Sequence, residues 1–152
     1  MALNPEFAGR VYPPGAPYVV GREKVREFAS AIGDANPASH DVDAARALGY
    51  GDLVAPATFA IIMSMRASDV VMFDPELGLD YSRVVHGEQR FAFTRPIVAG
   101  DELIVTTTIE SIRAAAGNDM IVTRGDVATT SGELVVTTRS TIVSRGADAA
   151  SA

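Results

Sequence analysis

Asp34, Asn36 and His40 lie within seven residues of one another, in the polar segment from Gly33 to His40. An imidazole titrates near neutral pH, and a nearby carboxylate can act as its base or fix its orientation. The segment therefore contains a candidate catalytic acid/base pair, Asp34 and His40. The same residues are typical of a helix end followed by a turn, because Gly accepts positive φ and Asn and Asp bond their own backbone. Spacing alone leaves both interpretations open.

The flanking sequence predicts a helix on each side of this polar segment. Between Arg22 and Ile32, apolar residues follow the i, i+3, i+4, i+7 spacing of a half-buried helical face. After the segment, Asp41 or Asp43 can cap a short helix that runs through Leu48. We therefore expect the polar segment to be a turn held between two helices.

A third predicted helix differs from the first two because it is apolar on every side. Thr58 is a candidate N-cap, and the helix is expected to run to about Met72. Its first residues, 59–63 together with Met65, are almost all apolar and occupy all sides of the helix. We expect its first turns to be buried all round.

From about Arg83 onwards, apolar residues recur at every second position, which is typical of β-strands. One strand carries Phe91 and Phe93 on one face, and we expect His86 at its start to pair with the backbone. Three further strands are predicted near residues 103–109, 120–130 and 134–143. The connections between successive strands are of hairpin length, which predicts an antiparallel meander.

A buried helix followed by an antiparallel sheet indicates an α+β fold in which the sheet wraps around the helix. The length of 152 residues and a hydrophobic content of 47% fit one globular domain, which we expect over residues 1–146. The small, polar residues 147–152 are expected to form a flexible tail.

Composition excludes several classes of function. The net charge of −6 argues against a general nucleic-acid binder. The absence of cysteine excludes disulfides, thiol nucleophiles and thiolate metal sites. The N-terminus does not resemble a signal peptide, and no apolar run is long enough to span a membrane. We expect a cytoplasmic protein that uses no metal or cofactor and binds neither nucleic acid nor membrane.

Four motifs, in the correct order, resemble the MaoC-like N-terminal dehydratase family, which includes the mycobacterial (3R)-hydroxyacyl-ACP dehydratase subunits HadA and HadC. The motifs are Gly21–Phe28, Gly33–Pro37, Ala55–Phe59 and Phe93–Leu103. The resemblance extends from about Phe7 to Val143. It implies a hot-dog fold and a hydro-lyase reaction, the reversible addition of water across a trans-2-enoyl thioester of CoA or acyl-carrier protein.

The resemblance also assigns roles to individual residues. In the active hydratases an Asp and a His share one water, and a backbone N–H at the start of the buried helix polarises the thioester carbonyl. Asp34 matches the catalytic Asp, Asn36 the motif Asn, and Ala57 the residue that provides the amide. The family His is replaced by Ser39, and His40 lies one residue later. The expected substrate-binding residues are Ser39, Ala57, Thr58, Phe59 and Met63.

Three functions remain open on these grounds. We favour a catalytically degenerate dehydratase subunit that binds the acyl chain, in a dimer with a MaoC-like (HadB-like) subunit that supplies the Asp and the His. The first alternative is a self-sufficient homodimeric enoyl-CoA hydratase that uses Asp34 and His40. The second is a non-catalytic protein that binds acyl thioesters. A hot-dog thioesterase is less favoured, because residues 58–68 contain no Asp or Glu.

Overall fold

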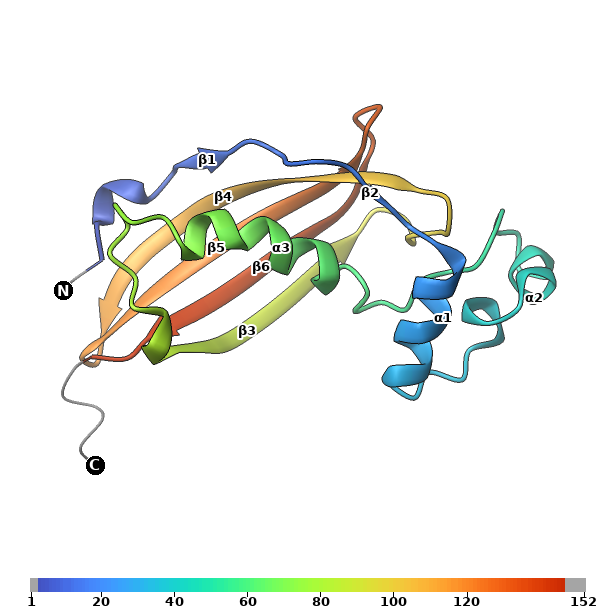
Figure 1. The fold of residues 1–152 in the computed structure, drawn as a ribbon, viewed down its shortest axis with the longest axis horizontal. Coiled ribbons are helices and arrows are strands. Elements are labelled where there is room, and N and C mark those ends of the chain that lie inside the picture. The colour runs from blue at the N-terminus through green and yellow to red at the C-terminus, as the bar shows by residue number, and fades with distance from the viewer. Residues whose placement is uncertain (1–2, 147–152) are drawn as a thin grey trace.

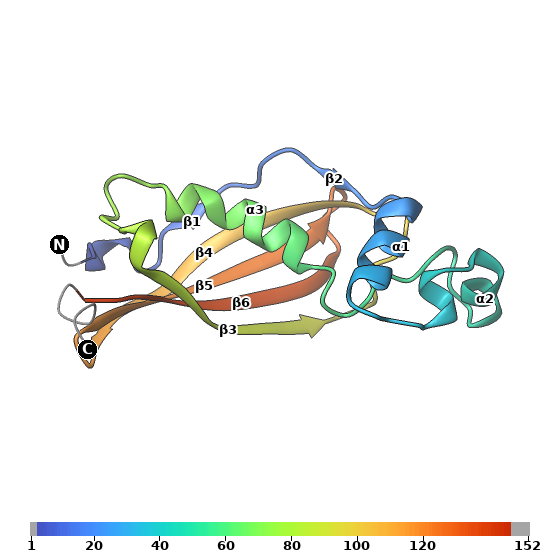
Figure 2. The same ribbon diagram turned by 60° about the horizontal axis from the view of Figure 1, so that its bottom comes forward.

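A computed structural model describes residues 3–146 of the chain. One antiparallel sheet carries a long helix on its concave face, and two shorter helices lie beyond one end of the sheet (Figure 1). Figure 2, a rotated view of the same ribbon, shows that the sheet curves beneath the helix. The α+β hot-dog arrangement predicted from the sequence is therefore confirmed. The elements are η1 (Pro5–Phe7), β1 (Val11–Tyr12), β2 (Tyr18–Val19), α1 (Arg22–Ala31), η2 (Pro37–Ser39), α2 (Val42–Ala47), α3 (Ile61–Met72), η3 (Tyr81–Arg83), β3 (Val84–Phe93), β4 (Glu102–Ala115), β5 (Asn118–Thr129) and β6 (Leu134–Ser144).

The sheet has the strand order β1-β4-β5-β6-β3, and β2 also pairs with β4. The predicted meander is confirmed for β4, β5 and β6, which pair in succession. The expected hairpin between β3 and β4 is wrong, because β3 pairs with β6 at the opposite side of the sheet from β1 and β2.

The reason for this difference lies in the segment between β3 and β4, which pairs with residues 53–55 instead of folding back as a hairpin. Val98 forms an isolated bridge with Val54. The Ala55 N–H donates to the Ile97 carbonyl at 2.9 Å, and the Ala99 N–H donates to the Leu53 carbonyl at 2.9 Å. The segment therefore crosses the end of the sheet and supports the chain that leads into α3 (Figure 1).

The central helix α3 begins at Ile61, two residues later than an N-cap at Thr58 would place it. Thr58 does not cap it: Ala60 is the N-cap residue, without a side-chain hydrogen bond, and the preceding residues form turns. Phe59 and Met63 are buried as expected. Met65 is 62% exposed, so the prediction that the first turns of the helix are buried on every side is wrong at Met65. The helix packs against β4 and β5, which leaves the face of β3 less covered.

The two shorter helices agree with the sequence prediction. Asp41 caps α2, because its Oδ1 accepts the N–H groups of Asp43 and Ala44. The predicted flexible tail, 147–152, lies outside the described residues. None of the helices within residues 3–146 is long and apolar enough to cross a membrane.

Candidate active site

The polar segment between α1 and α2 bonds mainly to itself. Gly33, with φ +72°, reverses the chain after α1. The Asp34 carboxylate then accepts the Asn36 N–H at 2.9 Å, and the Asn36 side-chain oxygen accepts the Ala38 N–H at 3.1 Å. Both predicted site residues therefore act here as caps of their own turn.

His40 lies beside Asp34, but it contacts the backbone of Asp34 and not its carboxylate. His40 Nε2 is 2.7 Å from the Asp34 carbonyl oxygen. A carbonyl can only accept, so Nε2 carries the proton and the lone pair of a neutral ring is on Nδ1. The backbone carbonyl of His40 accepts from Arg26 Nε at 2.9 Å, which fixes the residue against α1. The structure thus brings the two side chains onto one loop without pairing them.

Ser39 points away from His40, into the protein. Its side chain is 1% exposed, and its hydroxyl donates to the Val54 carbonyl at 2.7 Å. The Val54 N–H in turn donates to the Ala38 carbonyl at 2.9 Å. This double contact joins the polar segment to the chain that leads into α3.

The residues before α3 form the second part of the candidate site. Ala57 and Thr58 are exposed, and within residues 3–146 the Ala57 N–H has no hydrogen-bond acceptor. Phe59 anchors this turn, because its ring packs edge-on against Phe28 at 5.4 Å and Tyr18 at 6.5 Å. A backbone N–H without an acceptor can stabilise a developing negative charge on oxygen. Met63 follows one turn later in the core.

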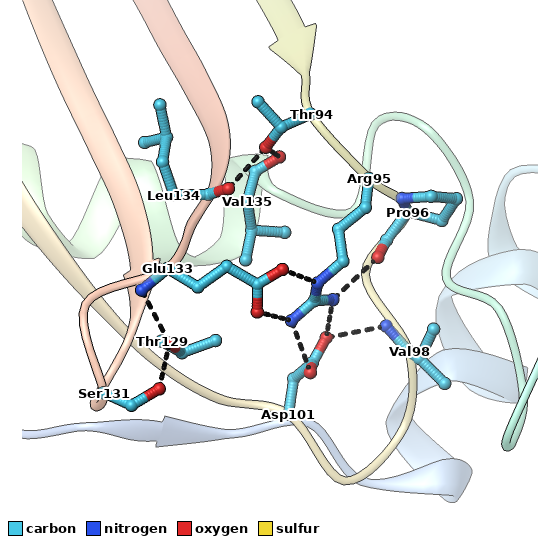
Figure 3. Close-up of polar contacts among 10 residues, drawn as sticks. All are labelled: Thr94, Arg95, Pro96, Val98, Asp101, Thr129, Ser131, Glu133, Leu134 and Val135. Atoms are coloured by element: carbon cyan, nitrogen blue, oxygen red, sulfur yellow. Dashed lines mark hydrogen bonds and ion pairs between the residues drawn. The ribbon is translucent and has the colours of Figure 1, made fainter.

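An arginine-centred network lies in the segment between β3 and β4, and it was not singled out from the sequence (Figure 3). Arg95 binds both carboxylate oxygens of Asp101, at 2.8 and 3.0 Å, and its Nε binds Glu133 at 2.9 Å. Asp101 also accepts the Val98 N–H at 2.9 Å. These hydrogen bonds, above all those that Arg95 donates to Asp101, raise the pKa of Arg95 above its usual range. The network fixes Val98, which bridges to Val54.

We expect Arg95→Gln to lower the free energy of unfolding by about 2 kcal/mol, because the largely buried Asp101 carboxylate would lose its charged partner. Urea denaturation measures the effect. Arg90→Gln is the matched control, since its pair with Glu88 is exposed and should be worth less than about 0.5 kcal/mol. Equal losses for the two variants would contradict a special role for Arg95.

A second ion pair joins Arg22, the first residue of α1, to Asp52. Arg22 donates to Asp52 at 2.6 and 2.8 Å, and this interaction lowers the pKa of Asp52 to about 2. A lowered pKa contributes stability that is present above pH 3.8 and is lost as the pH falls through about 2. We therefore expect acid unfolding of Asp52→Asn to depend less on pH between these values. A denaturation series against pH checks this, and an unchanged slope would contradict it.

The fold and the site together describe a hot-dog domain that has an open backbone amide in the turn before its central helix and a polar turn attached to the same segment. The chain matches the family model described as "FAS1-like, dehydratase domain region" over residues 6–138. It therefore belongs to this MaoC-like hot-dog dehydratase family.

Individual relatives agree with this assignment. A UPF0336 protein from Streptomyces avermitilis is 57% identical over 148 residues, covering 97% of this chain and 99% of the relative. A structure of a MaoC-like dehydratase is 39% identical with a TM-score of 0.86; the match covers 93% of this chain but only 43% of that one. A chain of the C-terminally truncated HadBC (3R-hydroxyacyl-ACP dehydratase) complex from Mycobacterium tuberculosis is 36% identical with a TM-score of 0.80, covering 90% and 96%.

Within residues 3–146, no group of three or more His, Cys, Asp or Glu side chains is placed to hold a metal ion. Asp34 and His40 are of residue types that can transfer protons, and the Ala57 amide, without an acceptor in residues 3–146, is free to donate to a carbonyl.

Proposed function

We propose that this chain is the acyl-binding, catalytically degenerate subunit of a (3R)-hydroxyacyl-thioester dehydratase, which also hydrates the corresponding trans-2-enoyl thioester. A MaoC-like (HadB-like) partner supplies the catalytic Asp and His. One observation carries the proposal: the Asp34 carboxylate bonds to the Asn36 N–H, and His40 Nε2 bonds to the Asp34 carbonyl. An Asp and a His that share one water must both point at it, and catalysis tolerates small displacements poorly.

In this proposal the chain still contributes to the site. The Ala57 amide polarises the thioester carbonyl, with Thr58 exposed beside it, while Phe59 and Met63 form the apolar support behind them. Ser39, whose hydroxyl is bonded to Val54, keeps the polar turn attached to this support and is a positioning residue. Asn36 has a similar role, because it caps η2.

The proposed partner surface lies along the edge strand β3 and the exposed side of α3. The outer edge of β3 pairs with no strand among residues 3–146. Val85 and Phe93 on β3 and Met65 on α3 are large hydrophobic side chains with substantial exposure. Unpaired edges and exposed apolar side chains favour association with another chain. A dehydratase of acyl-CoA or acyl-carrier-protein thioesters would act in fatty acid metabolism in the cytoplasm.

We expect the protein to be at least a dimer, and a homodimer when it is expressed alone. Joining two β3 edges would extend one sheet across both subunits and would cover Val85 and Phe93. Light scattering at micromolar concentration gives the mass directly. A monomeric mass under these conditions would contradict the proposed use of the edge.

The test of the proposed function is co-expression with each MaoC-like protein encoded in the same genome, with a tag on this chain only. The complexes are then assayed for hydration of crotonyl-CoA and of the crotonyl thioester of acyl-carrier protein. The proposal predicts one stable complex that is far more active than this chain alone. If this chain forms no complex with any of them, the heteromeric function is wrong.

A second candidate function is a self-sufficient homodimeric hydratase. The observation that favours it is the position of His40, whose Nδ1 has no hydrogen bond within residues 3–146 and whose ring lies on the same loop as Asp34. A protein that binds acyl thioesters without turning them over is the third candidate. Activity of the purified protein alone distinguishes the second candidate from the third.

A further inference from the structure

A cavity of about 240 Å³ lies between α3 and the concave face of the sheet, under the part of the helix furthest from Ala57. Hydroxyl side chains from the helix and from three neighbouring strands line it: Ser64, Ser68, Thr107, Thr123, Thr138 and Ser140. Ser64 and the three threonines are buried. A surface that only packs a helix onto a sheet, or only holds a saturated acyl chain, would have apolar side chains in these positions.

Four of the six hydroxyl groups donate to a backbone carbonyl, and Ser64 does so to that of Ile61 at 3.4 Å. Ser68 donates to the Ser64 carbonyl at 2.8 Å, Thr138 to the Gly125 carbonyl at 3.3 Å and Thr107 to the Ala67 carbonyl at 3.4 Å. Each hydroxyl oxygen keeps lone pairs that can accept a further hydrogen bond. A ligand that carries an O–H donor matches these acceptors, and a saturated hydrocarbon chain does not.

His86 adds a second polar group at the rim of the cavity. It was expected to pair with the backbone, but its Nε2 lies 3.1 Å from the Ser140 hydroxyl. The register of β3 shifts immediately after His86, and such a bulge alters the direction of the neighbouring side chains. His86 and Ser140 therefore form one polar pair facing the cavity.

Gly125 leaves room for the Thr138 side chain in the lining of the cavity. A Cβ added at this position would lie 2.6 Å from Thr138 Oγ1 and 3.3 Å from Val105 Cγ1. Glycine inside a strand costs stability and marks a position where something approaches closely. Here the group that approaches closely is the Thr138 hydroxyl, so the glycine allows Thr138 to take its place in the lining.

We propose that this cavity binds a hydroxyl group carried on the acyl chain, so that the substrate class of the protein is hydroxylated acyl thioesters. The inference rests on the proposed acyl-binding function. Ser64 and Ser68 lie about 5 to 10 Å further along the helix axis than Ile61. The hydroxyl that they recognise is therefore several carbons beyond the thioester, and it is not the 3-hydroxyl group that takes part in the reaction.

Isothermal titration calorimetry of the purified protein tests the inference with two probes. One is decanoyl-CoA, and the other is the same thioester with one hydroxyl group in the distal half of its acyl chain. We expect the wild type to bind the hydroxylated probe roughly fivefold more tightly, because one net hydrogen bond typically increases affinity by about this factor. Thr123→Val combined with Thr138→Val keeps the shape of the cavity and should abolish the preference. Thr141→Val, on the opposite face of β6, is the matched control and should retain it.

Equal affinity of the wild type for the two probes would overturn the hydroxyl site while leaving the proposed function intact. Failure of the wild type to bind either probe would overturn the proposed function as well.

Discussion

The purified chain without a partner should hydrate crotonyl-CoA roughly 10²–10⁴-fold more slowly than its complex with a MaoC-like subunit, which is the typical contribution of general acid–base catalysis. The physical reason is the direction of two side chains. The Asp34 carboxylate is bonded to the Asn36 N–H, and His40 Nε2 is bonded to a backbone carbonyl. The Ala57 amide can still polarise the substrate, so a residual rate should remain.

His40→Ala is the variant that separates this explanation from a self-sufficient enzyme. In the isolated protein it should change the residual rate by less than about threefold, because the imidazole is not part of the proton transfer. The measurement is the steady-state rate of crotonyl-CoA hydration, with circular dichroism as a check of folding. A fast wild type that loses its activity in His40→Ala would show instead that the loop brings His40 into the site.

The second large effect concerns the Ala57 amide. In the complex, Ala57→Pro removes the N–H and should lower kcat by roughly 10²–10³-fold, as for the loss of one oxyanion donor. The substitution should be tolerated structurally, because proline is favoured at the second position of a β-turn, which Ala57 occupies in the turn closed by the Phe59 N–H and the Pro56 carbonyl, and the Ala57 N–H has no acceptor within residues 3–146.

Ala57→Gly is the matched control for this prediction, since it changes the side chain but keeps the amide. It should retain most of the activity, and thermal melts of both variants should stay close to the wild type. A complex containing Ala57→Pro that works at the wild-type rate would show that the thioester carbonyl is polarised elsewhere.

The sequence predicted the helices and strands themselves better than it predicted the start of α3 and the pairing partner of β3. Periodicity of apolar residues identified α1, α3 and the strands, because burial on one face imposes that period on each element separately. The start of α3 was placed too early, at Thr58, since the burial of Phe59 and Ala60 in a turn depends on the aromatic contacts with α1 and β2 and not on local capping.

The pairing of β3 was wrong for a related reason. A short connection is compatible with a hairpin, but the partner of a strand is decided by contacts that are distant in sequence. Here these are the bridge between Val98 and Val54 and the ion pair of Arg95 with Glu133. No local pattern of residues encodes them.

For the site, the sequence identified the residue types but not their directions. Asp34 and His40 do lie together on one loop, as their spacing indicated. Which atom of each faces the other depends on the backbone conformation of the turn at Gly33 and on the anchoring of His40 by Arg26. The cavity beneath α3 was not anticipated, because alternation predicts which face a threonine lies on but not the space beside it.

The central claim is that the proton-transferring groups belong to the partner subunit. It is tested most directly by the rate of crotonyl-CoA hydration by the complex when this chain carries Asp34→Asn, a change that preserves shape and removes the charge. The account predicts a rate within about threefold of the wild-type complex, because Asp34 serves only its own turn. A loss of roughly 10²-fold or more would contradict the account and assign the catalytic carboxylate to this chain.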